Sequence, residues 1–226
     1  MTLEITTKIG CTNNCSYCCQ DKLLKNYIGN LFMTTTQFKK ILDNTPIDVQ
    51  IDFAGYCEPF LNPWASWMIR YASDQGYEIV LDTTLTGFTD KEANSLRGVR
   101  FKQVYVHDFK NVSKEKIELL RNIVITDKFE VGRLESRHIF SRAGNLWHMN
   151  NKSGRFECGW NSDFTRNVVL PNGDAYLCCM DYSLKHRIGN LFTTNYMDLD
   201  RESIFELSNK EESECICRKC EICRIK

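Results

Sequence analysis

The sequence lacks a long apolar run, a net charge and any low-complexity tract. Its first ten residues, MTLEITTKIG, carry neither a charged segment followed by an apolar one nor the run of about 20 apolar residues that spans a membrane. We therefore expect a cytoplasmic protein without a membrane role. The 29 basic residues balance the 29 acidic ones, so no overall field favours nucleic acid. With only 4 Pro in 226 residues, we expect one α/β domain with a small appendage and no long linker.

Cysteine, by contrast, is abundant and unevenly placed. Twelve cysteines are many for a cytoplasmic chain, because thiols stay reduced there and structural disulfides are rare. Between residues 20 and 157 only Cys57 occurs, whereas disulfide scaffolds spread their cysteines through small domains. The remaining thiols form two groups: Cys11, Cys15, Cys18 and Cys19 near the start, and Cys158, Cys178, Cys179, Cys215, Cys217, Cys220 and Cys223 near the end. Two clusters of this kind indicate metal.

Strand and helix patterns alternate through the first two thirds of the chain. Period-two segments predict strands at 3–9, 49–55, 77–84 and 102–108, with a weaker one at 130–136. Helical spacing and capping signals predict helices at 34–45, 62–76, 89–96 and 113–123, with Pro63 in the first turn of the second. Such alternation predicts a parallel sheet. We expect a partial, open βα barrel of five or six units over residues 1–150, with function at the carboxyl ends of its strands.

The loop after the first strand carries Cys11, Cys15 and Cys18 at unequal spacing. Three thiolates on a four-iron cluster leave one iron without a protein ligand, so a small molecule can coordinate there. Structural zinc is the alternative, but it favours four closed ligands, and no histidine lies nearby in sequence.

Cys-x3-Cys-x2-Cys after a first strand, with Tyr17 before the third cysteine, resembles the cluster motif of the radical S-adenosylmethionine (SAM) enzymes. The resemblance implies that Cys11, Cys15 and Cys18 bind a [4Fe-4S] cluster whose open iron chelates SAM. It also implies that one electron cleaves SAM to a 5'-deoxyadenosyl radical, which abstracts hydrogen from a substrate.

Further segments resemble the SAM pocket of that family. FAGYCEP at 53–59 resembles its glycine-glutamate motif, with Gly55 and Glu58 as candidates for the SAM amino group, although Cys57 stands where glycine is usual and could simply be a small packed residue. TTLTG at 83–87 resembles the hydroxyl-bearing strand-three segment, but Thr83 and Thr84 also suit a plain strand. His107 ends strand four, where the family has ribose or substrate contacts, and Arg142 in SRAGN is a candidate for the SAM carboxylate. The alternative for His107 is an ordinary structural histidine, and the alternative for Arg142 is a surface salt bridge.

The second cysteine group resembles the short SPASM or "twitch" extension with an auxiliary [4Fe-4S] cluster, here over residues 151–226. Independently, strands at 166–170 and 174–179 around Pro171-Asn172-Gly173 predict a hairpin. The resemblance implies ligation by Cys158, Cys178, Cys217 and Cys220. Cys223 competes with Cys217, since both form a Cys-x2-Cys pair with Cys220, and zinc stays open as an alternative.

The resemblance implies chemistry more directly than it implies a substrate. SRAGN and IGNL favour maturation of a ribosomally made peptide. Because the chain starts at strand one, we expect recognition of the precursor by a separate small leader-binding protein. The alternative is a dehydrogenase or epimerase of a sugar, cyclitol or nucleotide-derived small molecule. Either reaction needs a reductant such as flavodoxin or ferredoxin. A non-catalytic metal-binding module is the third hypothesis, but it has no need for GYCEP and TTLTG.

Overall fold

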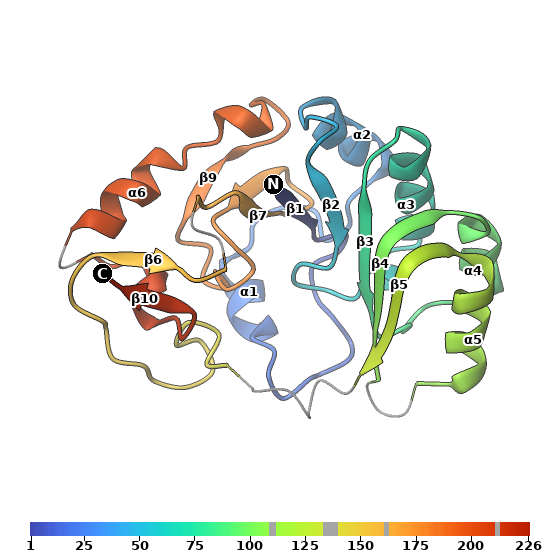
Figure 1. Cartoon of the computed structure of the whole chain (residues 1–226), viewed down its shortest axis with the longest axis horizontal. Helices are drawn as coiled ribbons and strands as arrows, with labels where there is room; N and C mark the ends of the chain where they lie inside the picture. The colour runs from blue at the N-terminus through green and yellow to red at the C-terminus, as the bar shows by residue number, and fades with distance from the viewer. Residues whose placement is uncertain (109–111, 133–139, 161–162, 211–212) are drawn as a thin grey trace.

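An eight-stranded mixed sheet organises the chain, in the order β5-β4-β3-β2-β1-β7-β8-β9 (Figure 1). The computed structural model describes residues 1–108, 112–132, 140–160, 163–210 and 213–226. Strands β1 to β5 run parallel to their neighbours. Their bounds are β1 (Thr2–Ile5), β2 (Gln50–Phe53), β3 (Ile79–Thr83), β4 (Arg100–His107) and β5 (Ile125–Gly132). The predicted partial βα barrel is therefore confirmed.

Helices connect successive parallel strands and cover the outer face of this part of the sheet (Figure 1). They are α2 (Thr35–Asp43), α3 (Ala65–Asp74), α4 (Asp90–Leu96) and α5 (Lys114–Ile123). Capping boxes begin two of them, with Thr34 paired to Gln37 and Thr89 paired to Glu92, so the first backbone N–H groups are satisfied. The apolar stripe of α2, formed by Phe38, Ile41 and Leu42, is buried in the main core.

Two predicted boundaries were wrong, and one helix was missed. Asn62 accepts a hydrogen bond from the Trp64 N–H (2.9 Å), which forms a turn before α3, so Pro63 precedes the helix instead of lying in its first turn. Strand β5 begins at Ile125 because its ladder with β4 starts at Arg100; residues 133–136 of the predicted strand lie outside the described residues. The short helix α1 (Gln20–Asn26), directly after the first cysteine loop, was not predicted.

The C-terminal third continues the sheet beyond β1. Strand β7 (Arg166–Val169) pairs with β1 in parallel, and β8 (Asp174–Tyr176) and β9 (Arg187–Asn190) follow antiparallel. The predicted hairpin around Asn172 and Gly173 is thus present. A second sheet contains only β6 (Phe156–Cys158) and β10 (Cys223–Ile225). The remaining elements are η1 (Pro59–Leu61), η3 (Tyr196–Asp198), α6 (Glu202–Asn209) and η4 (Ile216–Lys219).

The sheet crosses the predicted division at residue 150, since β7 pairs with β1, and the division into two domains stays a prediction. One apolar core joins both parts, because Leu3 and Phe53 belong to the same buried cluster as Leu177 and Cys217. In the described parts of the chain, no helix combines the length and hydrophobicity that a membrane span requires.

Candidate active site

A cavity of about 270 Å³ lies at the carboxyl ends of β1 to β4, and we call it the SAM-motif cavity. It brings together the whole set of residues that the sequence predicted for the first cluster and for SAM. Those lining residues are Cys11, Cys15, Tyr17, Cys18, Gly55, Glu58, Thr83, Thr84, His107 and Arg142. They come from five separate segments of the chain, so the cavity exists only in the folded barrel.

The cysteine loop is tied to the end of β3 by a residue that sequence reasoning missed. Buried Asn13 donates from Nδ2 to Thr84 Oγ1 (2.8 Å) and accepts at Oδ1 from Thr86 Oγ1 (2.8 Å). Within the loop, the Cys18 N–H donates to the Cys15 carbonyl (3.0 Å). The loop around Cys11, Cys15 and Cys18 is therefore held against TTLTG by side-chain hydrogen bonds, which a search for cysteine spacing does not detect.

Cys57 is more than a packed small residue. The pKa of Cys11 is lowered to about 6, first by a hydrogen bond with Cys57 and then by the Asn13 and Glu58 backbones and the charge of Lys8, against the opposing effect of burial. The Cys57 thiol lies 3.6 Å from the Gly10 carbonyl, within donating distance. Cys57, in the loop after β2, therefore contacts the cysteine loop at Gly10 and Cys11. It stands in the position where the resembled motif usually has glycine.

Glu58 is a buried carboxylate at the centre of the cavity wall, with an exposed fraction of 5%. Its Oε1 accepts from Thr83 Oγ1 (2.6 Å) and the Phe60 N–H (3.2 Å), and its Oε2 accepts from the Thr84 N–H (2.6 Å) and Thr84 Oγ1 (2.7 Å). Burial raises the pKa of Glu58 to about 7, although these hydrogen bonds lower it. Among the ion pairs between described residues none includes Glu58, so its charge has hydrogen-bond donors but no cation.

Gly55 has a left-handed conformation (φ +64°), and a Cβ atom there would collide with Thr6 Oγ1. The next N–H, from Tyr56, donates to that same Thr6 oxygen (3.2 Å). Glycine is therefore required where the β2 loop packs on β1. This requirement is structural and does not depend on a ligand.

His107 and Arg142 also line the SAM-motif cavity. His107 Nε2 is 3.6 Å from Asp82 Oδ1, and its Nδ1 is buried with no hydrogen-bond partner. Arg142 lies in a tight turn where it, Ala143 and Gly144 all have positive φ. Asn145 holds this turn by donating to the carbonyls of Arg142 (2.6 Å) and Met180 (2.9 Å), so the SRAGN segment is fixed against the cysteines that follow β8.

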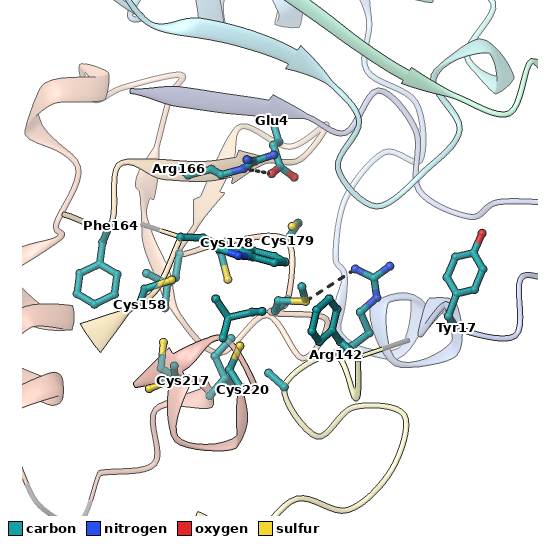
Figure 2. Close-up of a pocket in the computed structure, with 18 residues that line it drawn as sticks. Glu4, Tyr17, Arg142, Cys158, Phe164, Arg166, Cys178, Cys179, Cys217 and Cys220 are labelled. Atoms are coloured by element: carbon teal, nitrogen blue, oxygen red, sulfur yellow. Dashed lines mark hydrogen bonds and ion pairs between the residues drawn. The ribbon is translucent and has the colours of Figure 1, made fainter. Parts of the chain in front are cut away.

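A second cavity of about 610 Å³ contains six of the seven late cysteines, and we call it the six-cysteine cavity. They are Cys158, Cys178, Cys179, Cys217, Cys220 and Cys223. In Figure 2 the sulfur atoms of Cys158, Cys178, Cys217 and Cys220 surround a common space. Burial raises the pKa of Cys178 and of Cys220, and for Cys217 a hydrogen bond with Cys215 raises it even more than burial does. These thiols are therefore neutral until a metal replaces their protons.

Two devices position the late cysteines. The β6–β10 ladder places Cys223 directly opposite Cys158. Arg218, buried beside Cys217, donates to the carbonyls of Lys152 (2.7 Å) and Gly154 (2.9 Å) and thereby holds η4 to the segment before β6. The Cys223 thiol lies 3.7 Å from the Arg224 carbonyl, within donating distance. Both Cys217 and Cys223 line the cavity. Figure 2 shows Cys217 among the four labelled thiols around the common space, whereas the Cys223 thiol has the Arg224 carbonyl as a partner.

The size of the thiol sets bears on the choice of metal. Among the described residues, no three Cys, His, Asp or Glu side chains lie close enough to hold a single metal ion. The late set consists of thiols alone, and no histidine is among the described residues that line the six-cysteine cavity. This donor set fits an iron-sulfur cluster, which is ligated by cysteine thiolates and is larger than one ion, and the zinc alternative gains no support from the geometry.

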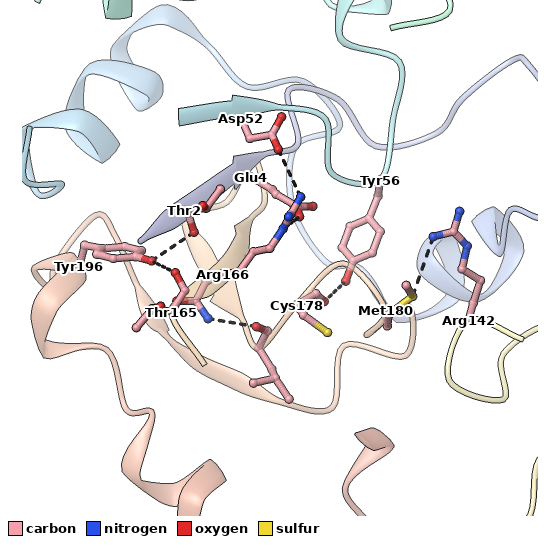
Figure 3. A network of polar contacts seen from close by, with 12 residues as sticks. Thr2, Glu4, Asp52, Tyr56, Arg142, Thr165, Arg166, Cys178, Met180 and Tyr196 are labelled. Atoms are coloured by element: carbon pink, nitrogen blue, oxygen red, sulfur yellow. Dashed lines mark hydrogen bonds and ion pairs between the residues drawn. The ribbon is translucent and has the colours of Figure 1, made fainter. Parts of the chain in front are cut away.

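The two cavities share a wall formed by five residues: Glu4, Tyr17, Arg142, Arg166 and Cys179. Figure 3 shows Arg166 between two carboxylates, donating to Glu4 (2.8 Å) and to Asp52 (3.4 Å). Both acids are almost fully buried. Burial raises the pKa of Asp52 well above its usual value, and Glu4 and Asp82 raise it further, while Arg166 lowers it.

Sequence reasoning missed the acidic residues inside the parallel strands, although the sequence contains a signal for them. Glu4, Asp52 and Asp82 each follow an apolar residue inside a predicted strand, in TLEI, QIDF and VLDT. Glu4 and Asp52 are also direct partners in the β1–β2 ladder. An acidic residue at the interior of several buried parallel strands is unusual, because such strands are nearly all apolar.

Comparison with known proteins agrees with this architecture. Residues 158–221 match the SPASM family, described as an iron-sulfur cluster-binding domain. A search of the curated protein sequences gives no match. The structure of BtrN in complex with AdoMet and 2-DOIA is similar with a TM-score of 0.69 at 16% identity, over 98% of this chain and 92% of that one.

Two further structures share the fold. The anSMEcpe structure with bound AdoMet and Cp18Cys peptide has a TM-score of 0.55 at 14% identity, over 97% of this chain and 86% of that one. Streptococcus suis SuiB bound to precursor peptide SuiA has a TM-score of 0.51 at 11% identity, over 98% of this chain and 69% of that one. The resemblance predicted from the sequence is confirmed in two respects: residues 158–221 match the SPASM iron-sulfur cluster-binding domain, and the chain shares its fold with these three structures.

Proposed function

We propose that this chain is a radical SAM enzyme of the SPASM/twitch type and that it abstracts hydrogen from a substrate bound between its two cysteine-lined cavities. The observation that carries the proposal is their shared wall: the SAM-motif cavity and the six-cysteine cavity meet at Glu4, Tyr17, Arg142, Arg166 and Cys179. A substrate at this wall would lie next to both cofactor sites.

In the SAM-motif cavity, Cys11, Cys15 and Cys18 would hold a four-iron cluster with one open iron. When bound there, the cluster would supply the electron that cleaves SAM to a 5'-deoxyadenosyl radical. Glu58 fits the SAM amino group, because it is a buried carboxylate without a cation among the described ion pairs, and an ammonium group would stabilise its charge. Thr83 and Thr84 orient that carboxylate by donating to both of its oxygens.

In the six-cysteine cavity, Cys158, Cys178, Cys217 and Cys220 would hold the auxiliary cluster, with Cys223 as the competing ligand. Because burial raises the pKa of several of these thiols, cluster assembly must release protons and should be favoured by higher pH. When bound, this cluster would accept an electron or hold the reacting intermediate. Arg218 and the β6–β10 ladder keep the thiols in place.

For the substrate we propose a ribosomally made peptide, delivered by a separate leader-binding protein that adds a peptide strand to its own sheet. The peptide is supported by SRAGN and IGNL, and by the fold shared with anSMEcpe and SuiB, whose structures hold peptides. Within SRAGN, Arg142 lines both cavities and Ala143 lines the six-cysteine cavity.

A small polar molecule is the second candidate, and a specific observation favours it. The shared wall is charged: Arg166, whose side chain is 49% exposed, pairs with buried Glu4 of the wall and with buried Asp52, which lines neither cavity. Such groups suit hydroxyl or amino substituents better than an apolar side chain. The BtrN structure, which matches nearly the full length of both chains, contains 2-DOIA.

The test is anaerobic turnover of the reconstituted protein with SAM and a reductant. We expect slow formation of 5'-deoxyadenosine without substrate, and stimulation when precursor peptide and leader-binding protein are both supplied. Deuterium at the attacked carbon should appear in 5'-deoxyadenosine. Efficient turnover of a free sugar or cyclitol without any protein partner would refute the peptide proposal and support the alternative.

A further inference from the structure

An exposed apolar patch lies beside the first cysteine loop and has no role in the function proposed above. It consists of Leu24, Ile28, Leu31 and Phe32, whose side chains are 47%, 88%, 49% and 43% exposed, and we call it the 24–32 patch. Four large apolar side chains within nine residues are more than scattered surface hydrophobics. Clusters of this kind commonly mark sites of protein contact.

The backbone under the patch is firmly held. The Ile9 N–H donates to the Leu31 carbonyl (2.7 Å), and Lys8 forms an antiparallel bridge with Phe32. Asn172, from the hairpin turn, donates to the Ile28 carbonyl (3.1 Å). Because these bonds order the segment, its apolar side chains are displayed in a fixed arrangement, which lowers the entropic cost of binding a partner.

The segment that carries the patch has more basic than acidic residues. Residues 8–32 contain three lysines, Lys8, Lys22 and Lys25, and one acidic residue, Asp21, in a chain that has no net charge. Lys22 and Lys25 lie exposed on α1, and Lys8 Nζ lies 5.2 Å from the centre of the Phe32 ring. An apolar centre with a basic border is complementary to a partner with an apolar centre and an acidic border.

The patch adjoins the loop that carries Cys11. Lys8 Nζ donates to the Gly10 carbonyl (2.7 Å), and a Cβ atom at Gly10 would lie 3.8 Å from Leu24 Cδ2. Lys8 pairs with Phe32 and Ile9 pairs with Leu31. Only Gly10 lies between this paired segment and Cys11 in the sequence. A protein seated here would therefore lie next to the loop that carries the first cluster site.

We propose that the 24–32 patch is the docking surface for an acidic one-electron carrier protein, a reduced flavodoxin or an iron-sulfur ferredoxin. The inference rests on the proposed function, because that reaction consumes one electron for each SAM cleaved. The carrier is oxidised by one electron, and that electron breaks one carbon–sulfur bond of SAM, releasing methionine. Complementary charge would raise the association rate, as it does for steered protein pairs.

The test compares two reductants on the same reconstituted protein. Lys22→Glu with Lys25→Glu should lower 5'-deoxyadenosine formation driven by the reduced carrier about tenfold or more at low salt, and leave formation driven by dithionite unchanged. Lys114→Glu with Lys116→Glu, an exposed and a half-buried lysine of α5, is the control pair and should change neither rate. Ile28→Glu should also lower the carrier-driven rate and leave the dithionite-driven rate unchanged. Ile47→Glu, at 55% exposure in another loop, is its control and should change neither rate.

The outcomes separate this inference from the proposed function. An unchanged carrier-driven rate in both patch variants would overturn the docking site, as would an equal loss with both reductants, which indicates cluster damage. If the unaltered protein makes no 5'-deoxyadenosine with dithionite, the proposed function fails, and calorimetric titration with the carrier still tests docking. Self-association of the unaltered protein that Ile28→Glu abolishes would assign the patch to a second copy of the chain and refute the proposal.

Discussion

Replacement of Glu58 by glutamine perturbs the SAM-motif cavity without changing its shape. Both carboxylate oxygens accept a backbone N–H, from Phe60 and from Thr84. Hydroxyl groups can rotate to accept a hydrogen bond, but a backbone N–H cannot. Either orientation of a glutamine amide therefore puts its NH2 group against one of these two donors, and the strand-two and strand-three loops lose a shared anchor.

The expected magnitude follows from the lost charge. A hydrogen bond to a charged group contributes about 1.5–3 kcal/mol. At about 1.4 kcal/mol for each factor of ten, SAM affinity should fall about 10- to 150-fold. Iron content should stay unchanged, because no cysteine is altered.

Equilibrium binding of SAM to the reconstituted protein, with iron determined on the same samples, measures this effect. Glu92→Gln is the matched control: it is also a buried glutamate, but it belongs to the capping box of α4, where glutamine serves equally. An affinity of Glu58→Gln equal to that of the control would refute the assignment of Glu58 to the SAM amino group.

The remaining predictions concern backbone and cysteines. Gly55→Ala should lower the free energy of unfolding by more than Gly98→Ala does in chemical denaturation. Both substitutions cost roughly 1–2 kcal/mol for a left-handed residue, but only an alanine at position 55 also collides with Thr6. Equal losses would contradict the packing argument. Cys217→Ser should remove the auxiliary iron and Cys223→Ser should retain it, and the reverse result would exchange their roles. Cys178→Ala should spare SAM cleavage yet reduce finished product, and unimpaired product formation would argue against an auxiliary cluster in the reaction.

The sequence predicted those parts of the fold that depend on local patterns. Period-two segments located β1 to β4, and helical spacing with capping signals located α2 to α5. The Pro171-Asn172-Gly173 turn located the β7–β8 hairpin. Helix α1 escaped detection because it is short and lacks a capping side chain at Cys19. The pairing of β7 with β1 also could not be predicted, since a parallel contact across more than 160 residues has no local signature.

The candidate site was predictable where motif spacing carries the chemistry, as for Cys11, Cys15, Cys18 and Glu58. Residues that act through tertiary contacts were not. Asn13 connects the cysteine loop to Thr84, and Arg166 pairs with Glu4 and Asp52, but each of these bonds joins segments distant in sequence. Their roles depend on the register of the sheet, which hydrophobic pattern alone does not determine.

The central claim is that Cys11, Cys15 and Cys18 support SAM cleavage while the late cysteines hold a separate cluster. Replacing all three by alanine, followed by anaerobic reconstitution and incubation with SAM and dithionite, tests it most directly. We predict about four irons in place of about eight, by the arithmetic of two four-iron clusters, together with loss of 5'-deoxyadenosine. Continued formation of 5'-deoxyadenosine by the triple variant would contradict the claim.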